Sequence, residues 1–165
     1  MDSNITLIAC VDQNNGIGKD NQLLFNLPDD MRFFRETTRD SIVIMGRTTY
    51  ESIGKPLKNR INIVLSQSYT SVEKFELALH GVIVMDDLRE LKKILNTYDP
   101  EKEVFIIGGQ SIYEQFMDTA DRLIITHVDK EEAADSFFPL ITDEWFVTKE
   151  IELTRSATIR YYSPV

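Results

Sequence analysis

The stretch VFIIGGQSIYEQF, residues 104–116, shows how this chain is organised. Residues 104–107 are continuously apolar and predict a buried strand, and residues 111–117 predict a helix. Gly108 and Gly109 lie between them, where glycine permits a sharp turn or lets a phosphate approach the backbone. The stretch lacks the G-x-G-x-x-G spacing, so taken alone it fits a tight structural turn better than a phosphate site. A strand, a turn and a helix in succession predict one unit of an α/β fold.

The rest of the chain repeats this alternation. Apolar runs bounded by turn residues predict further strands at residues 5–11, 42–45, 61–66, 82–85 and 123–128, and periodic segments predict helices at 27–37, 49–53 and 87–96. Residues 145–153 and 157–163, separated by a short polar segment, predict an antiparallel hairpin. We therefore expect one α/β domain over residues 1–165, with a central, mostly parallel sheet of about eight strands, a C-terminal antiparallel hairpin and about four helices.

Composition and charge favour a small-molecule role in the cytoplasm. The formal net charge of −9 argues against binding to nucleic acid or to an anionic membrane. The chain opens MDSN, unlike a secretory signal, and no apolar run approaches the ~20 residues of a membrane span. Cys10, the single cysteine, lies in an apolar run, which predicts a buried structural thiol in a reducing compartment.

Asp30, in the segment NLPDDMRFF, is a carboxylate on the apolar side of a predicted helix. At ~100° per residue it falls on the side of Met31 and Phe34, whereas Asp29 falls on the side of Arg32. An ionised carboxylate is costly to bury without a partner, so Asp30 marks a candidate site. A helix cap or an ion pair with a distant arginine explains the pattern equally well.

Two further segments carry arginines at strand boundaries. Gly46, Arg47, Thr48 and Thr49 form a second turn from strand to helix, where an arginine and two hydroxyls can hold an anion. Arg60 precedes the strand at 61–66 and either binds a ligand or meets a carbonyl group or a surface acid. Two histidines and one cysteine in the whole chain do not favour a transition-metal site.

The joint order of these segments resembles the dihydrofolate reductase family of the bacterial chromosomal type. The resemblance rests on LIACVDQNNGIG, NLPDDMRFF, VIMGRTTYESIGKPL, RINIVLS, VFIIGGQSIYEQF, LIITHV and DSFFP, which span nearly the whole chain. It implies a cytoplasmic, monomeric oxidoreductase that takes NADPH as its cofactor and reduces 7,8-dihydrofolate to 5,6,7,8-tetrahydrofolate. Hydride would pass from nicotinamide C4 to pterin C6, with protonation at N5, in support of one-carbon metabolism and thymidylate synthesis. Dihydrofolate and antifolate inhibitors are the implied partners; nucleic acid, membrane and metal are not.

The resemblance also implies the site residues. Asp30, Thr126 and Leu23 are implied as catalytic residues, with Asp30 binding the pterin 2-amino group and N3 while a water carries the proton to N5. The implied substrate site comprises Ile8, Phe25, Asp30, Met31, Phe34, Leu57, Arg60, Ile107 and Thr126, with Arg60 pairing with the glutamate-tail carboxylate. The implied cofactor site comprises Ala9, Ile17, Gly18, Leu23, Gly46, Arg47, Thr48, Thr49, Ser66, Gln67, Ile107, Gly108, Gly109, Gln110, Ser111, Ile112 and Tyr113. In this family the bond between the two glycines is cis.

The resemblance predicts a lid as well. Residues 12–24 and 130–136 read as loops, and residues 15–24 resemble the family's lid over the nicotinamide, which Asp135 would brace. The family usually has Pro-Trp where this chain has Leu24 and Phe25, so the indole N–H that orients a water near the substrate is absent.

Two other classes of protein compete with this interpretation. Another reductase on the same scaffold, from a pterin or riboflavin pathway, would share the fold. Asp30 and Arg60 favour folate over it, because one suits an aminopterin edge and the other a carboxylate tail. A non-catalytic nucleotide-binding module would need neither Asp30 nor a lid.

Thr48 replaces a basic residue that some members of the family carry near the adenosine 2′-phosphate, so a preference for NADPH would depend on Arg47.

Overall fold

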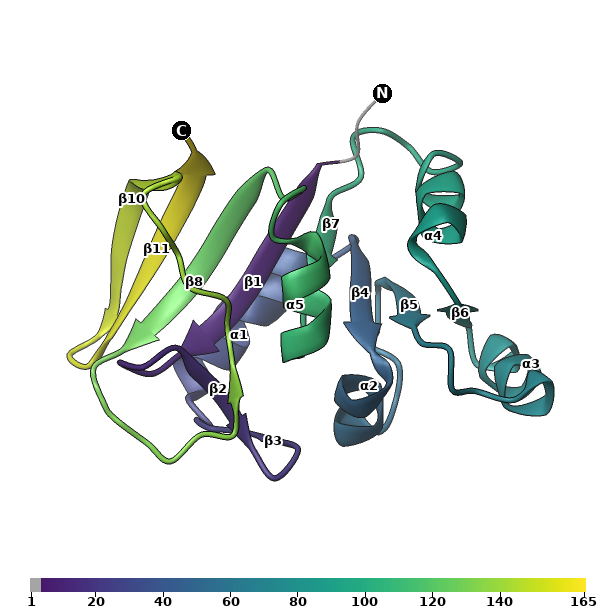
Figure 1. The fold of residues 1–165 in the computed structure, drawn as a ribbon, viewed down its shortest axis with the longest axis horizontal. Helices are drawn as coiled ribbons and strands as arrows, with labels where there is room; N and C mark the ends of the chain where they lie inside the picture. The colour runs from purple at the N-terminus through teal and green to yellow at the C-terminus, as the bar shows by residue number, and fades with distance from the viewer. Residues whose placement is uncertain (1–3) are drawn as a thin grey trace.

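An eight-stranded sheet forms the centre of the molecule in the computed structural model, which describes residues 4–165 (Figure 1). Its strands lie in the order β10 (Trp145–Thr154), β11 (Ala157–Pro164), β8 (Arg122–Val128), β1 (Ile5–Val11), β7 (Val104–Ile106), β4 (Ile42–Gly46), β5 (Ile61–Leu65) and β6 (Val82–Met85). The strands from β8 to β6 are parallel, whereas β11 is antiparallel to β8 and to β10. The predicted fold class, the parallel sheet and the terminal hairpin are confirmed.

The sheet carries five helices rather than about four. These are α1 (Pro28–Thr38), α2 (Arg47–Ile53), α3 (Ser71–Leu79), α4 (Leu88–Leu95) and α5 (Gln110–Phe116). The sequence analysis missed α3, although Val72, Phe75 and Leu79 recur at helical spacing; in the structure these three side chains are exposed. Its start did carry a signal, since Thr70 and Glu73 form a capping box. No helix within residues 4–165 has both the length and the apolar character needed to span a bilayer.

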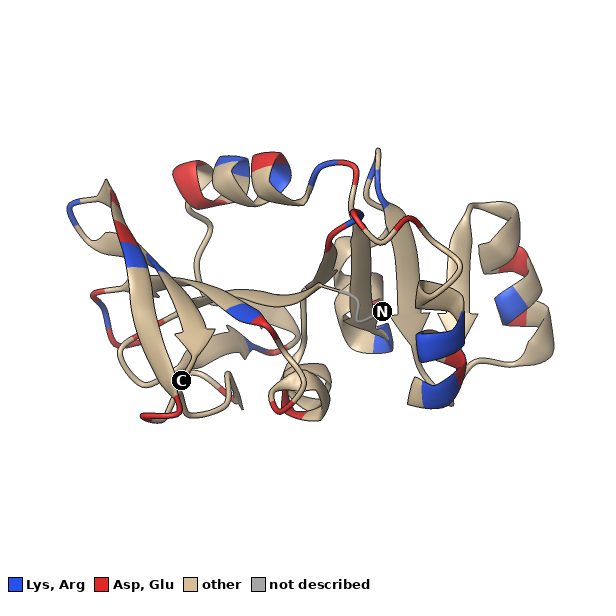
Figure 2. Ribbon diagram, turned by 90° about the horizontal axis from the view of Figure 1, so that it is seen from above, with Lys and Arg blue, Asp and Glu red and all other residues tan. Residues whose placement is uncertain are grey.

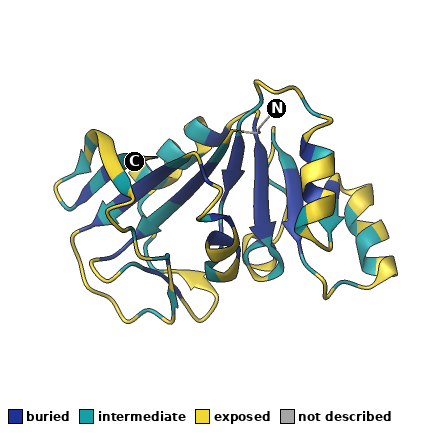
Figure 3. Ribbon diagram, turned by 45° about the horizontal axis from the view of Figure 1, so that its top comes forward, coloured by how far each residue is buried: buried dark blue, intermediate teal, exposed yellow. Residues whose placement is uncertain are grey.

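Both faces of the sheet are covered, which explains why its strands are apolar throughout. On one face, Leu91 of α4 and Ile112 and Phe116 of α5 join a core cluster with alternate strand residues. On the other face, Tyr50 of α2 and Phe34 of α1 pack against a second cluster. Figure 2 shows α1 and α5 on opposite sides of the sheet, and Figure 3 shows the burial concentrated in the central strands.

The two segments predicted as loops contain a small second sheet. It consists of β3 (Gln22–Leu23), β2 (Gly16–Lys19) and β9 (Ser136–Phe137), in that order. Asp20 and Asn21 turn between β2 and β3 with φ of 50° and 62°, as in a two-residue hairpin turn. The prediction of plain loops was wrong because these strands are too short for a periodic pattern, and because β2 pairs with β9, which lies far along the chain.

The candidate site lies where β7 ends between its two neighbours. β7 pairs with both β1 and β4, and the chain then turns at Gly108 and Gly109 into α5. In open α/β sheets, ligands bind outside the carboxyl ends of the strands at such positions.

Candidate active site

The carboxylate of Asp30 is held in the first turn of α1, which starts at Pro28. Its Oδ1 accepts a hydrogen bond of 2.5 Å from the hydroxyl of Thr126 in β8, a residue that is 2% exposed. Burial raises the pKa of Asp30, although hydrogen bonds from Thr126 and Cys10 oppose the rise. Asp29 is exposed and lies 3.7 Å from Arg32. The predicted difference between the two adjacent acids is confirmed.

Cys10 does not occupy the purely structural position that the sequence predicted. It is the register partner of Thr126 across the parallel strands β1 and β8, so both side chains point to the Asp30 side of the sheet. The thiol is half-buried and faces the Asp30 carboxylate closely enough to influence the pKa of that group. Burial and the charge of Asp30 raise its pKa far above the usual range. Sequence reasoning missed this contact because it depends on strand register.

An apolar wall adjoins the carboxylate. Ile8 of β1 is 7% exposed and belongs to the cluster on the α1 face, against which Phe34, Leu57 and Ile107 pack as partly buried side chains. Met31, next to Asp30 on α1, is 44% exposed. The structure therefore brings four of the predicted substrate-site residues into one cluster and leaves Met31 at its open side.

Arg60 is anchored to the backbone near the end of α1. Its Nε donates to Thr38 Oγ1 at 2.9 Å, and its Nη atoms donate to the carbonyl oxygens of Lys58 and Arg35. Within residues 4–165 no carboxylate forms an ion pair with it. Burial lowers its pKa, and the positive charges of Arg39 and Arg35 add to this effect. The three arginines form a cationic corner that suits an anionic group.

The turn from β7 to α5 requires glycine. The bond between Gly108 and Gly109 is cis, as the family resemblance implied, and Gly108 has a φ of 115°. A Cβ at Gly108 would lie 3.1 Å from the ring of Tyr113, which is 4% exposed. The Tyr113 hydroxyl donates to the carbonyl oxygen of Ile8 at 2.7 Å. Tyr113 therefore fixes the turn against β1.

The second glycine turn lies directly beside the first. The amide of Gly46 donates to the carbonyl oxygen of Gly108 at 2.9 Å, which joins the ends of β4 and β7. A Cβ built on Gly109 would have the hydroxyl of Thr49 as its nearest neighbour, at 3.6 Å. The space between the two turns is thus bounded by glycine backbone and an alcohol, and this lining fits phosphate oxygens.

Arg47 begins α2 and is held by four side chains. Its Nε lies 2.7 Å from Glu51 Oε1, its Nη2 lies 3.5 Å from Glu73 Oε2, and its Nη1 donates to the carbonyl and hydroxyl oxygens of Ser68. The guanidinium carbon lies 4.1 Å from the centre of the Tyr69 ring. The hydrogen bond that Arg47 donates to Glu51 raises the pKa of Arg47. The guanidinium is therefore fixed in place at the edge of the site.

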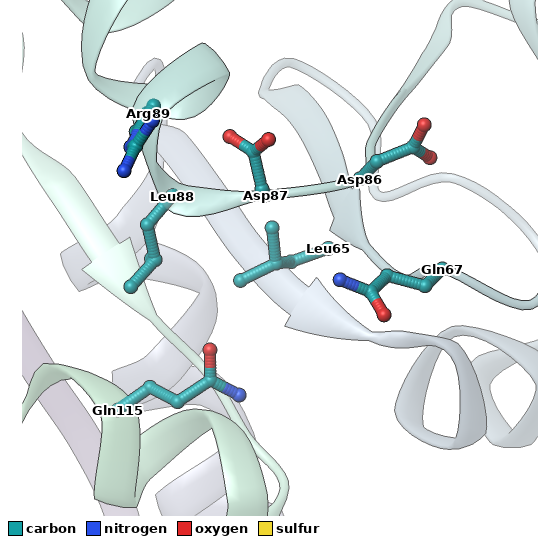
Figure 4. Close-up of a pocket in the computed structure, with 7 residues that line it drawn as sticks. All are labelled: Leu65, Gln67, Asp86, Asp87, Leu88, Arg89 and Gln115. Carbon is teal, nitrogen blue, oxygen red and sulfur yellow. The ribbon is translucent and has the colours of Figure 1, made fainter.

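A pocket of about 480 Å³ opens at the ends of β5 and β6. Figure 4 shows its lining, which combines two apolar side chains with charged and amide groups: Leu65, Gln67, Asp86, Asp87, Leu88, Arg89 and Gln115. The sequence analysis named only Gln67 among them. Asp86 and Asp87 directly follow a predicted strand, which was a usable signal, but the approach of Gln115 from α5 depends on the packed sheet.

The remaining predicted cofactor residues are distributed over several elements. Ile112 is 6% exposed and packs in the core, and Thr48 is exposed next to Arg47. Others lie in β1 and β2, just after β5, and in the first turn of α5: Ala9, Ile17, Gly18, Ser66, Gln67, Gln110 and Ser111. Residues 4–165 contain no cluster of three or more His, Cys, Asp or Glu side chains placed to hold a metal ion.

Asp12 connects the two segments of the small sheet. It is 2% exposed, and its carboxylate accepts hydrogen bonds from the backbone amides of Asn14, Gly16 and Glu132 at 2.7–3.0 Å. Burial opposes ionisation, but the amides of Glu132, Gly16 and Asn14 outweigh it and keep the pKa of Asp12 below its usual value. The sequence analysis did not identify this residue.

Further hydrogen bonds hold the predicted lid and the neighbouring strand β9. Asp135 Oδ2 accepts from the amide of Asp20 at 3.0 Å, as its predicted bracing role requires. The side-chain oxygen of Gln110 accepts from the amide of Phe137 at 2.8 Å, so this side chain holds β9. Leu23, at the end of the hairpin, is 76% exposed, and Phe25 is half-buried.

An α/β sheet with two adjacent glycine turns at its strand ends and a separate half-buried carboxylate fits an oxidoreductase that uses a nicotinamide nucleotide, and the comparisons with known proteins show this class. The family model for dihydrofolate reductase matches residues 4–163. The chain belongs to the dihydrofolate reductase family, and its reaction is the NADPH-dependent reduction of dihydrofolate.

Known relatives agree over most of the chain. It is 40% identical to dihydrofolate reductase of Haemophilus influenzae over 141 residues, covering 85% of this chain and 82% of the relative. It is 38% identical to the Bacillus subtilis enzyme over 135 residues, covering 82% and 75%. The structure of dihydrofolate reductase from Enterococcus faecalis, complexed with NADP(H) and RAB-propyl, aligns with a TM-score of 0.82 and 28% identity, covering 97% of this chain and 95% of that one.

Proposed function

We propose that Asp30, supported by Thr126, anchors the pterin ring of dihydrofolate through its 2-amino group and N3. The hydrogen bond between Thr126 and Asp30 is the observation that carries this role, because it fixes an acid in a half-buried wall. Burial makes the free carboxylate costly, and two N–H donors of the pterin edge offset that cost. NADPH supplies the hydride that reduces pterin C6. Asp30 favours protonation at N5 through its charge, while water carries the proton.

The apolar wall would orient the rings of the substrate. Ile8, Phe34 and Ile107 offer flat apolar contact to the pterin and benzoyl groups, and Leu57, Met31 and Phe25 complete the sides. The cationic corner of Arg35, Arg39 and Arg60 would bind the carboxylate of the glutamate tail. Phe25 keeps apolar contact but provides no N–H for a water, so proton delivery would not depend on an indole.

The cofactor would extend from this wall to the edge formed by β5 and β6. Tyr113, Ala9, Ile17 and Leu23 would surround the nicotinamide, and the two glycine turns with Thr49 and the first turn of α5 would hold the pyrophosphate. Arg47, Thr48 and Ser66 would bind the adenosine 2′-phosphate. The pocket at the ends of β5 and β6 would receive adenine, since Leu65 and Leu88 offer apolar contact and Gln67 and Gln115 offer amide groups, beside the charged Asp86, Asp87 and Arg89.

We also propose that residues 1–165 form one domain that acts as a cytoplasmic monomer. A continuous sheet with one apolar cluster on each face supports a single domain. Cys10 is the only cysteine of the chain, and this suits a reducing compartment.

Replacement of Asp30 by Asn tests the proposed role. Asn has nearly the same size but no charge, so we expect kcat/KM for dihydrofolate, followed by loss of NADPH absorbance, to fall by about 10²–10⁴-fold. Asp29→Asn is the matched control, because the same charge is removed from the adjacent exposed position. Full activity of Asp30→Asn, or an equal loss in both variants, would remove Asp30 from its role.

A further inference from the structure

Arg47 forms ion pairs with two carboxylates at different distances. Glu51 lies one turn along α2, with a 2.7 Å contact to Nε, and its side chain is 55% exposed. Glu73 reaches Arg47 from α3, with a longer contact of 3.5 Å to Nη2. With Ser68 on Nη1, every nitrogen of the guanidinium has a protein partner. These contacts use four of the five N–H groups, so a ligand phosphate at Arg47 either takes the remaining N–H of Nη2, beside Glu73, or replaces the contact to Glu73, which is the longest of them.

The side chain of Glu73 is held in place by a capping box at the start of α3. Its Oε1 accepts from the amide of Thr70 at 2.9 Å, and its own amide donates to Thr70 Oγ1 at 3.2 Å. Hydrogen bonds to Thr70, and then the charge of Arg47, lower the pKa of Glu73, so it is ionised at neutral pH. The neighbouring cation, Lys74, is paired with Asp86 at 2.5 Å. A phosphate at Arg47 would thus meet one cation and two carboxylates.

We propose that Glu73 is a specificity-determining residue that competes with the adenosine 2′-phosphate for Arg47 and weakens the preference for NADP(H) over NAD(H). This inference rests on the proposed role of Arg47. The reason is electrostatic: a fixed carboxylate near the phosphate repels it and also occupies its arginine, whereas NAD(H), with a 2′-hydroxyl, meets neither penalty. Thr48 offers no second cation at this position.

The test is Glu73→Gln, which removes the charge but keeps the capping box, because Gln also serves at this position of the box. Calorimetric titration of NADP⁺ and NAD⁺ measures binding without turnover. We expect the ratio of the two affinities to shift about three- to tenfold toward NADP⁺ at low salt, through tighter NADP⁺ binding and unchanged NAD⁺ binding. The shift should shrink as salt screens the charges.

Two controls separate this inference from the function on which it rests. Glu76→Gln removes the same charge from an exposed position of α3 and should leave the ratio unchanged. Arg47→Ala should abolish most of the NADP⁺ preference. If Arg47→Ala lowers the ratio but Glu73→Gln behaves like Glu76→Gln, Glu73 is not a determinant and the role of Arg47 stands. If Arg47→Ala leaves the ratio unchanged, both proposals are wrong.

Discussion

At the scale of single residues, the pKa of Asp30 is set by a balance between burial and two neighbouring side chains. Burial raises its pKa, while the hydroxyl of Thr126 and the thiol of Cys10 stabilise the charged form. Cys10→Ala removes one donor, so we expect the pKa of Asp30 to rise further, as measured by NMR titration of ¹³C-labelled aspartate carboxylates. Thr126→Val removes the stronger donor and should raise it more. A lower pKa in either variant would contradict this account.

Helical periodicity was enough to place Asp30 and to separate it from Asp29, because both lie on one local element. It was not enough for Cys10, since the contact to Asp30 needs β1 and β8 in register. Two partners of Arg47, Ser68 and Glu73, were missed for a similar reason, since they lie outside α2, whereas Glu51 lies one turn along α2 and was a usable signal. Residue-level chemistry was thus predictable where it follows from one helix, and not where it joins two elements.

At the scale of elements, Asp12 fastens the lid segment to the segment before β9. Asp12→Asn keeps an acceptor for Asn14 and Gly16 but places an amide against the Glu132 N–H, so this one of several links between the segments is lost. We expect the free energy of unfolding at pH 7, measured with urea, to fall by about 1–3 kcal/mol. Asp20→Asn, in the same lid at a position where Asn tolerates the positive φ, is the control and should change it little.

The same contact predicts a pH dependence. The pKa of Asp12 is lower in the folded chain than the usual ~3.9, so its stabilising effect is complete above that value and is lost as pH falls through the folded pKa. The stability difference between the parent and Asp12→Asn should therefore be largest near neutral pH and shrink in acid. A stability difference that grew on acidification would contradict this expectation.

Neither β2 nor β9 could be predicted from the sequence, because each strand is stable only when paired with the other.

At the scale of the whole molecule, the sheet separates the sole tryptophan from the proposed adenosine site. Trp145 lies in β10 at one edge, while the pocket lies at the ends of β5 and β6 at the other edge. The order of the strands in the sheet was not predictable from local sequence patterns. β1, the first strand of the chain, lies between β8 and β7, which come much later in the sequence.

This arrangement allows a test of the single domain. Adenosine 2′,5′-bisphosphate at about 100 times its Kd should stabilise the chain by about 2.7 kcal/mol and raise Tm by roughly 5–10 °C. If residues 1–165 unfold as one unit, Trp145 fluorescence and far-UV circular dichroism should shift together, although the ligand binds at the opposite edge. Arg47→Ala should reduce both shifts equally at the same ligand concentration. A fluorescence transition that stayed in place while the dichroism transition moved would mean that the strands around β10 unfold separately from the nucleotide-binding edge.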